Sequence, residues 1–314
     1  MTPAIQTLSL SRKFGRTVAL DRVDLEVPEG AVYALVGANG AGKTTLIKVL
    51  MNIFQPTGGA ATVLGIDSHK VSGKAFNRIG YVSENQQMPD WMTVGDMLAY
   101  FRNFYPQWDR DLEQQLLRQF DLPLKRKLKH LSRGMRMKAA FASSLAYRPA
   151  LIVLDEPFSG LDPLVRDELI EGLIDRAPET TIFLSSHDLA EIESFSSHVG
   201  FLEQGHLLFS EELSSLTGRF RDVTVTLTGP STLPPTPPPS WLQVEAADSV
   251  VRFVHSDYKG AAASEEFSRF FPSARDISVD AMSLRSIFLS IAKSGRIHDA
   301  SAASVLGKAK GGKE

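Results

Sequence analysis

The chain has 314 residues, 43% of them hydrophobic, and its 34 lysines and arginines nearly balance its 36 acids. This length supports a large domain plus a smaller one, and the near-neutral charge gives no general attraction to nucleic acid. The absence of cysteine excludes disulfides and thiol chemistry, and without a signal-peptide core or a run of about 18 apolar residues we expect no membrane anchor.

The first elements predicted along the chain lead into a phosphate loop. Residues 5–27 are typical of β-strands, and the apolar run 31–36 indicates a buried strand. Residues 37–44 then read Gly-Ala-Asn-Gly-Ala-Gly-Lys-Thr, followed by an apolar stripe at helical spacing over 46–54. In this strand–loop–helix context, backbone N–H groups and the helix N-terminus bind phosphate, so an ordinary glycine-rich turn is a poor alternative.

This loop predicts the binding of a nucleoside triphosphate with Mg²⁺. Lys43 is expected to reach the β- and γ-phosphates, and the Thr44 hydroxyl is expected to contact Mg²⁺. The predicted nucleotide-binding residues of the loop are Gly37, Asn39, Gly40, Gly42, Lys43, Thr44 and Thr45.

Helices are predicted in the interval that follows. Thr93 and Asp96 have the spacing of a capping box, which predicts a helix to about residue 104. A second helix is predicted from about Asp109, because apolar residues recur on one side of it. We expect most of the aromatic residues here to lie in the core and one or two to be exposed. They are Trp91, Tyr100, Phe101, Phe104, Tyr105 and Trp108.

An acidic pair follows the next predicted strand. Residues 151–154 read Leu-Ile-Val-Leu and are followed by Asp155 and Glu156. Parallel strands of α/β sheets present ligand-binding groups at their C-terminal ends. Asp155 is therefore expected to hold Mg²⁺ through water, and Glu156 to act as general base on the attacking water. The alternative, an acidic pair that only caps a strand, is disfavoured by the phosphate loop.

Three further motifs complete a recognisable set. Residues 131–135 read Leu-Ser-Arg-Gly-Met, residues 159–162 read Ser-Gly-Leu-Asp, and residues 185–188 read Ser-Ser-His-Asp. In this order, the motifs resemble the ATP-binding subunit of an ABC transporter over about two-thirds of the chain. The resemblance implies an α/β fold, with a P-loop NTPase (RecA-like) core, an antiparallel β subdomain and a helical subdomain.

The resemblance also implies roles for residues outside the phosphate loop. Phe14 matches the aromatic residue that stacks on adenine, although a core phenylalanine is the alternative. His187 matches the histidine that contacts the γ-phosphate. Ser132 and Gly134 match the loop that contacts the γ-phosphate bound to the opposite subunit. Asp162 matches a residue at the dimer interface, and a helix N-cap before proline is its alternative.

Three positions in two motifs depart from the pattern of the family. The usual signature is Leu-Ser-Gly-Gly-Gln, whereas Arg133 and Met135 replace its first glycine and its glutamine here. Arg133 either lies near the partner's triphosphate or points to solvent. Glu84 stands where glutamine is usual, and it is expected to ligate Mg²⁺ and to take part in catalysis, unless a shifted register places one of the glutamines at 86–87 there.

The domain organisation follows from these motifs and from a change of composition after about residue 205. We expect an ATPase domain at 1–215 with its helical subdomain at about 86–145. A small α+β domain is expected at 216–293, including a Pro-rich loop at 229–240, and a disordered tail at 294–314. The end of the small domain resembles the C-terminal appendage of type-2 ABC exporters.

The resemblance implies an ATPase that uses ATP and Mg²⁺ to power transport. Two copies, or this chain and a related subunit, would pair head-to-tail at the cytoplasmic face of the membrane, beneath separately encoded permease subunits. A soluble ABC ATPase of DNA repair or translation is the first alternative, disfavoured by the lack of a long coiled coil or a second cassette. A P-loop kinase or GTPase is the second, and it would lack the Leu-Ser-x-Gly loop.

Overall fold

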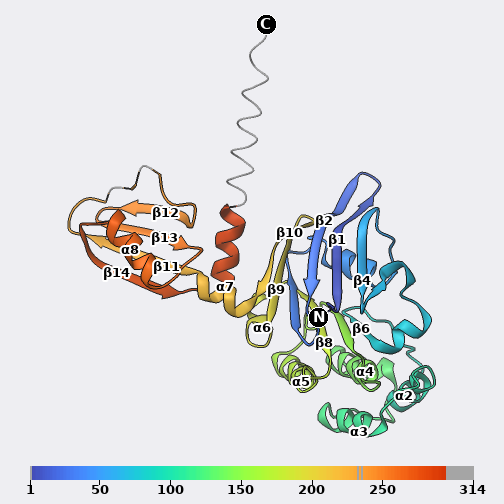
Figure 1. The fold of residues 1–314 in the computed structure, drawn as a ribbon. Coiled ribbons are helices and arrows are strands. Elements are labelled where there is room, and N and C mark those ends of the chain that lie inside the picture. The colour runs from blue at the N-terminus through green and yellow to red at the C-terminus, as the bar shows by residue number, and fades with distance from the viewer. Residues whose placement is uncertain (1, 232, 235, 295–314) are drawn as a thin grey trace. The chain divides into compact units, whose positions relative to one another are not determined.

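A computed structural model describes residues 2–231, 233–234 and 236–294. The chain divides into two compact units, Met1–Glu212 and Leu213–Glu314 (Figure 1). Apart from residue 294, the tail expected at 294–314 lies outside the described residues. Within the described residues, no helix is both long enough and apolar enough to cross a membrane.

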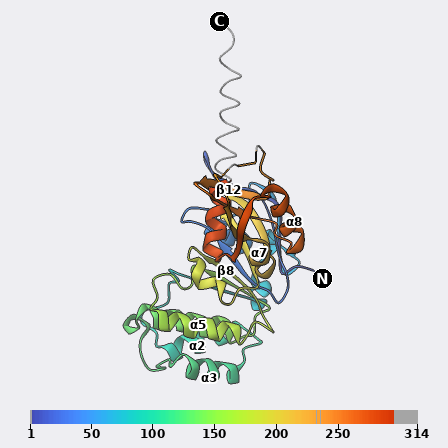
Figure 2. The same ribbon diagram turned by 90° about the vertical axis from the view of Figure 1, so that its left-hand side faces the viewer.

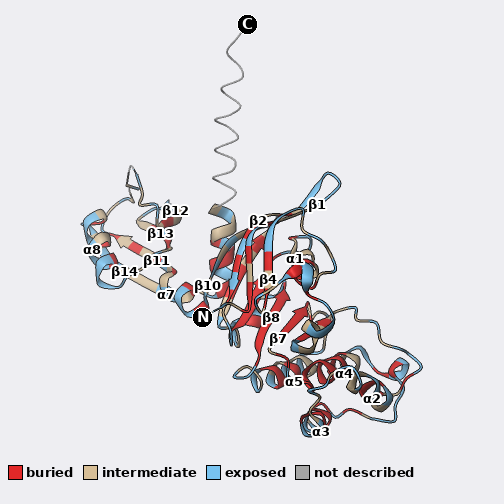
Figure 3. Cartoon of the chain, turned by 45° about the vertical axis from the view of Figure 1, so that its right-hand side comes forward, coloured by how far each residue is buried: buried red, intermediate tan, exposed pale blue. Residues whose placement is uncertain are grey.

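The first unit is built on a six-stranded sheet in which every pairing is parallel except that of β9 with β10. All residues of β3, β7 and β8 are buried, and Figure 3 shows β7 and β8 buried along their length. Near-continuous apolar runs of this kind suit parallel strands covered on both faces. In spatial order the strands are β10 (His206–Glu212), β9 (His198–Glu203), β3 (Val32–Val36), β8 (Thr181–Ser186), β7 (Leu151–Asp155) and β6 (Ile79–Ser83).

The register of this sheet brings several polar residues to one edge. Asp155, the last residue of β7, pairs with Ser83 of β6 on one side and with Ser185 of β8 on the other. The next residue of β8, Ser186, pairs with the last residue of β3, Val36. The loops after these strands therefore leave the sheet side by side, at the edge where α/β sheets bind ligands.

A second sheet in this unit is antiparallel, and it shares a hydrophobic core with the first. Its longest pair, β1 and β2, contains irregularities in register near Leu10. The core joins apolar side chains of both sheets and of helix α1. In spatial order the strands are β2 (Thr17–Val27), β1 (Ile5–Phe14), β4 (Gly58–Val63) and β5 (Ile66–Asp67).

Helix α1 (Lys43–Leu50) follows the phosphate loop, and it is shorter than the sequence stripe at 46–54 predicted. Asn52 adopts a left-handed φ of 55°. Its N–H donates to the Val49 carbonyl, and the N–H of Ile53 donates to the carbonyl of Lys48 at 2.8 Å. These two bonds form a Schellman motif, which ends a helix and satisfies its last carbonyls.

The other helices of the unit gather below the sheet edge, where α2, α3, α4 and α5 lie together in both views (Figures 1 and 2). The predicted helices are confirmed near their expected positions, with Asp109 as the N-cap of α3. The bounds are α2 (Val94–Arg102), α3 (Arg110–Gln119), α4 (Arg133–Leu145), α5 (Pro163–Ile174) and α6 (Leu189–Glu193), with short 3₁₀ turns at Ser68–Lys70, Gly73–Arg78 and Leu128–His130.

The predicted capping box at the start of α2 is confirmed. The Thr93 hydroxyl accepts from the Asp96 N–H at 3.1 Å, and the Asp96 carboxylate accepts from the Thr93 N–H at 3.2 Å. The hydrogen bond from the Thr93 hydroxyl, and then that from its N–H, lower the pKa of Asp96. The hydrogen bonds to the Asp96 carboxylate therefore stabilise the start of α2 at neutral pH, and this stabilisation is lost as the pH falls through the lowered pKa.

We expect Thr93→Ala to destabilise α2 by about 1 kcal/mol, the usual effect of removing a cap. Hydrogen–deuterium exchange should then speed up about 5-fold at residues 94–102, because 1 kcal/mol is about that factor in an equilibrium. Thr93→Ser keeps the hydroxyl and is the matched control. Equal exchange in the alanine and serine variants would contradict a stabilising box.

The second unit is a small α+β domain with an aromatic core. Trp241 stacks with Phe253 and with Phe271, with ring centroids 4.0 and 5.5 Å away, and Phe267 packs edge-on to it. With this domain, the α/β fold class expected from the sequence is confirmed. The elements are α7 (Leu213–Arg219), α8 (Ala261–Phe270), a helix at 284–294 and a sheet ordered β12 (Trp241–Ala247), β13 (Val250–His255), β11 (Arg221–Leu227) and β14 (Ala274–Ala281).

Candidate functional site

The phosphate loop holds its lysine in place with its own backbone. Lys43 is only 5% exposed, and its ammonium donates to the carbonyls of Gly37 at 2.6 Å and Ala38 at 3.2 Å. Gly42, the N-cap of α1, has a φ of 112°, which favours glycine. A Cβ at Gly37 would come within 2.2 Å of a backbone oxygen, so a larger residue does not fit there. The loop thus presents a buried cation at a helix N-terminus.

Asp155 lies beside the first residues of α1. Its Oδ1 accepts hydrogen bonds from the hydroxyls of Thr44 at 3.0 Å and Ser185 at 2.9 Å. Burial raises the pKa of Asp155, and the two hydroxyl hydrogen bonds only partly oppose this effect. The carboxylate therefore lacks a full counter-charge, and a cation bound here would favour its ionised form.

Glu156 is held between two basic side chains. One carboxylate oxygen lies 3.0 Å from the ammonium of Lys43, and the other lies 2.7 Å from Nδ1 of His187. The backbone N–H of Glu156 donates to the Ser185 hydroxyl at 3.0 Å. Glu156 also has a φ of 51°, a left-handed conformation that is uncommon outside glycine and marks local strain.

These groups open onto two adjoining hollows of about 290 and 250 Å³. Thr44, Glu84 and Glu156 line both of them. The larger hollow is completed by Lys48, Tyr81, Ser83, Asn85 and Asp155, and the smaller by Ala19, Asn39, Gly40, Ala41, Gly42, Lys43 and Thr45. Six of the seven residues predicted for the phosphate loop therefore line one space, and the seventh, Gly37, holds the lysine.

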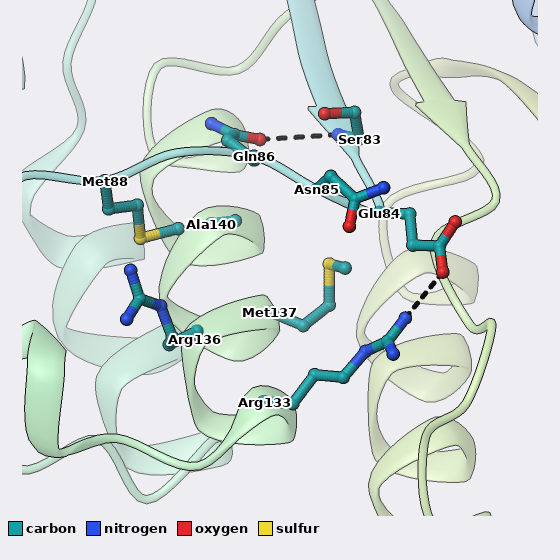
Figure 4. A pocket seen from close by; sticks show the side chains of 9 residues that line it. All are labelled: Ser83, Glu84, Asn85, Gln86, Met88, Arg133, Arg136, Met137 and Ala140. Atoms are coloured by element: carbon teal, nitrogen blue, oxygen red, sulfur yellow. Dashed lines mark hydrogen bonds and ion pairs between the residues drawn. The ribbon is translucent and has the colours of Figure 1, made fainter.

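Glu84 lies at this edge of the sheet, and Figure 4 shows Arg133 extending from the start of helix α4 to its carboxylate. The N–H of Glu84 donates to the Asp155 carbonyl at 2.9 Å. Its carboxylate accepts from the Arg133 guanidinium at 2.8 Å. From the sequence, Arg133 was expected either near the partner's triphosphate or in solvent, and neither alternative included this contact with Glu84. Gln86 instead accepts a hydrogen bond from the N–H of Ser83 at 3.4 Å. Of these two residues, Glu84 lines the two hollows beside the phosphate loop and Gln86 does not.

A third hollow of about 290 Å³ adjoins Glu84 on the side of α4. In Figure 4, Met88 lies beside Arg136, and Met137 lies between Arg136 and Arg133. The remaining lining residues are Ser83, Asn85, Gln86 and Ala140.

Besides Gly37 and His187, four predicted residues lie outside the lining of all three hollows. Ser132 is the N-cap of α4, where its hydroxyl accepts from the N–H of Met135, and a Cβ at Gly134 would meet Val165 at 2.9 Å. Asp162 caps α5 ahead of a proline, as its alternative interpretation proposed.

Phe14 is the fourth of these residues, and its ring is 40% exposed. The core alternative for Phe14 is therefore wrong. The ring packs edge-on against Phe54 at 5.3 Å, and the guanidinium of Arg12 lies 4.4 Å from the ring centroid.

Sequence reasoning missed Ser185 and Lys48. The Ser185 hydroxyl contacts both acids of the site, donating to Asp155 and accepting from the N–H of Glu156. A serine at the end of a buried strand, two residues before the predicted histidine, was the available signal. Lys48 lies one turn beyond Thr44 on α1 and lines the larger hollow.

Comparison with known proteins agrees with this geometry. A family described as ABC transporter matches residues 20–159. The bacitracin transport ATP-binding protein BcrA of Enterococcus faecalis is 31% identical over 228 residues, which are 71% of this chain and 74% of the relative. The ABC transporter ATP-binding protein YtrB of Bacillus subtilis is 30% identical, over 68% of this chain and 73% of the relative.

The chain belongs to the ATP-binding proteins of ABC transporters. An uncharacterised member from Synechocystis is 32% identical over 67% of this chain, and the matched part is 61% of that relative. A solved ATP-binding subunit of an ABC transporter superposes with a TM-score of 0.63 at 27% identity, covering 68% of this chain and 92% of the other. As an ABC ATP-binding protein, the chain binds ATP and is an ATPase.

The oxygen ligands of this ABC ATP-binding protein suit Mg²⁺. That ion prefers one or two carboxylates together with substrate phosphates and water, rather than a cage made by the protein. Asp155 and Thr44 place two oxygens 3.0 Å apart beside the phosphate loop, with Glu84 lining the same hollows. No cluster of three or more acidic or histidine side chains suited to a metal occurs among the described residues.

Proposed function

We propose that this chain hydrolyses ATP with Glu156 as general base and His187 and Lys43 as the groups that contact the γ-phosphate. The observation that carries the proposal is the position of one carboxylate, held 3.0 Å from a buried lysine and 2.7 Å from an imidazole. A base in this place is oriented before substrate arrives, which lowers the cost of reaching the transition state.

In the proposed mechanism, the phosphate loop binds the triphosphate through Lys43 and through its backbone N–H groups. Thr44 and Asp155 would hold Mg²⁺, with Glu84 beside them, and the ion would neutralise charge on the β- and γ-phosphates. Glu156 takes a proton from the attacking water, and His187 orients the carboxylate through its Nδ1 contact. Phe14 is proposed to offer its exposed ring to adenine.

The site is proposed to be completed by a second subunit, either another copy or a related chain. Ser132, Gly134 and Asp162 lie outside the hollows lined by the phosphate loop, although the resemblance assigns the first two to a γ-phosphate. A head-to-tail pair with two-fold symmetry would account for both the position and the assigned role of these residues, because each subunit then contributes the start of α4 to its partner's nucleotide. ATP binding would close the pair and hydrolysis would open it.

The proposed membrane partner is a separate permease, at the cytoplasmic face. Three of the six aromatic residues of the helical subdomain are exposed: Trp91 by 70%, Tyr100 by 49% and Phe104 by 56%. Tyr100 on α2 packs against Phe104, which lies two residues beyond the end of that helix, with ring centroids 5.0 Å apart. Exposed aromatic clusters favour docking, because such rings contribute much of the energy of protein interfaces.

We expect the double variant Tyr100→Glu and Phe104→Glu to move the chain from the membrane fraction of its own cells to the soluble fraction. The ATPase rate of the purified variant should stay within about twofold of wild type, since these rings lie outside the nucleotide site. Leu8→Glu, at another exposed apolar residue, is the matched control. Membrane association unchanged by the double variant would count against docking through α2.

Export is the proposed direction of transport. Relatives named for bacitracin transport, and a probable multidrug transporter ATP-binding protein of Escherichia coli at 33% identity, support it. The end of the C-terminal α+β unit, at residues 277–292, resembles the C-terminal appendage of type-2 exporters. The transported substrate would be selected by the permease.

A further inference from the structure

Two of the three positions at which this sequence departs from the family pattern contact each other. Glu84 follows strand β6, and Arg133 is the first residue of helix α4, 49 positions later. Oε1 of Glu84 lies 2.8 Å from Nη2 of Arg133 (Figure 4). An acid where the family has an amide is thus matched by a cation where the family has glycine.

Glu84 needs a counter-ion because of what surrounds it. Its hollow already contains the carboxylates of Asp155 and Glu156, and a triphosphate bound beside them would add several negative charges. The basic side chains lining the same two hollows are Lys43, which contacts Glu156, and Lys48. A third carboxylate without a partner would therefore repel the nucleotide in a partly dehydrated site.

Arg133 is held where it can serve as this counter-ion. Its guanidinium lies against Gly160, whose φ of 63° belongs to the loop that follows Glu156. A Cβ at Gly160 would lie 3.0 Å from Nη1 of Arg133, so glycine leaves the space that the guanidinium uses. Arg133 thereby contacts two loops of the sheet edge from the start of α4.

We propose that Arg133 is the positioning residue for Glu84, and that the neutral ion pair replaces the neutral glutamine of the family. The pair orients the acid and cancels its charge, so that an acid at position 84 is compatible with a bound triphosphate. This inference rests on the proposed nucleotide site.

The test measures binding of a fluorescent ATP analogue in EDTA, where no metal masks the repulsion. Arg133→Ala should weaken binding about 5-fold, the upper end for a partly exposed ion pair. In a Glu84→Gln background the same change should have less than about a twofold effect, because no charge is left to cancel. Arg133→Lys should bind like wild type, and 0.5 M salt should reduce the effect of Arg133→Ala.

Arg136→Ala is the matched control. Arg136 lies one turn further along α4, lines the same hollow, and pairs with Asp90 at 2.9 Å instead of with Glu84. Its loss should leave affinity in EDTA within about twofold of wild type.

Two results would overturn the pairing. Arg133→Ala could weaken analogue binding equally in the wild-type and Glu84→Gln backgrounds, or it could leave binding unchanged in the wild-type background. A wild-type chain that binds no analogue, with or without Mg²⁺, would instead overturn the proposed nucleotide site. If the wild-type chain binds the analogue and the effects of Arg133→Ala and Glu84→Gln on affinity simply add, only the role proposed for Arg133 is rejected.

Discussion

Glu156→Gln is expected to lower ATP turnover by a factor of about 10²–10⁴, the usual contribution of a general base. Glutamine has nearly the same shape, and its amide can still contact Lys43 and His187, but it cannot take a proton from water. Nucleotide binding should survive, because the phosphate loop and Asp155 are unchanged. Phosphate release under steady-state conditions measures the first effect, and calorimetry with ATP measures the second.

The same variant should accumulate as a nucleotide-bound pair of chains, because closure no longer ends in hydrolysis. Size exclusion at millimolar ATP and Mg²⁺ would detect the change of mass. Glu179→Gln removes an exposed acid that pairs with Arg148, and it serves as a control that should turn over ATP normally. Near-normal turnover by Glu156→Gln would reject this residue as the base.

Lys43→Ala is expected to weaken ATP binding by about 10- to 100-fold. A hydrogen bond to a charged group contributes about 1.5–3 kcal/mol, and each 1.4 kcal/mol is a factor of ten. The ammonium is almost fully buried and fixed by two backbone carbonyls, so it is already in place when the phosphates arrive. The substitution also leaves Glu156 without its cation, which adds repulsion of the nucleotide.

Calorimetry with ATP and Mg²⁺ would measure this loss. Lys74→Ala, at an exposed lysine that lines neither hollow of the site, is the control, and its effect should stay below about threefold. Circular dichroism would show that both variants keep their helices. Equal affinities for wild type and Lys43→Ala would remove this lysine from the site.

Contiguous motifs made much of the site predictable from the sequence. Thr44 and Lys43 are fixed by a loop of eight residues, and a loop between a buried strand and a helix has few other conformations. Asp155 was predictable because parallel strands end at a common edge, and its hydrogen bond to Thr44 joins the end of β7 to the start of α1. The capping box of α2 was predictable because its two partners are three residues apart.

Contacts between distant segments were not predictable in this way. The Glu84–Arg133 pair depends on how helix α4 approaches strand β6, and spacing along the chain carries no such information. Ser185 was overlooked because its role appears only when β7 and β8 are in register. The early end of α1 is set by the left-handed backbone of Asn52, whereas the apolar stripe continued past it to Phe54.

The left-handed backbone of Glu156 sets folding and chemistry against each other at one position. A non-glycine residue in this region costs on the order of 1–3 kcal/mol. Glycine, or to a lesser degree asparagine, adopts the same backbone with less strain, and neither has a carboxylate. With Glu156 as the proposed general base, selection for thermal stability alone would therefore favour residues that cannot support hydrolysis, whereas selection for turnover would favour the acid.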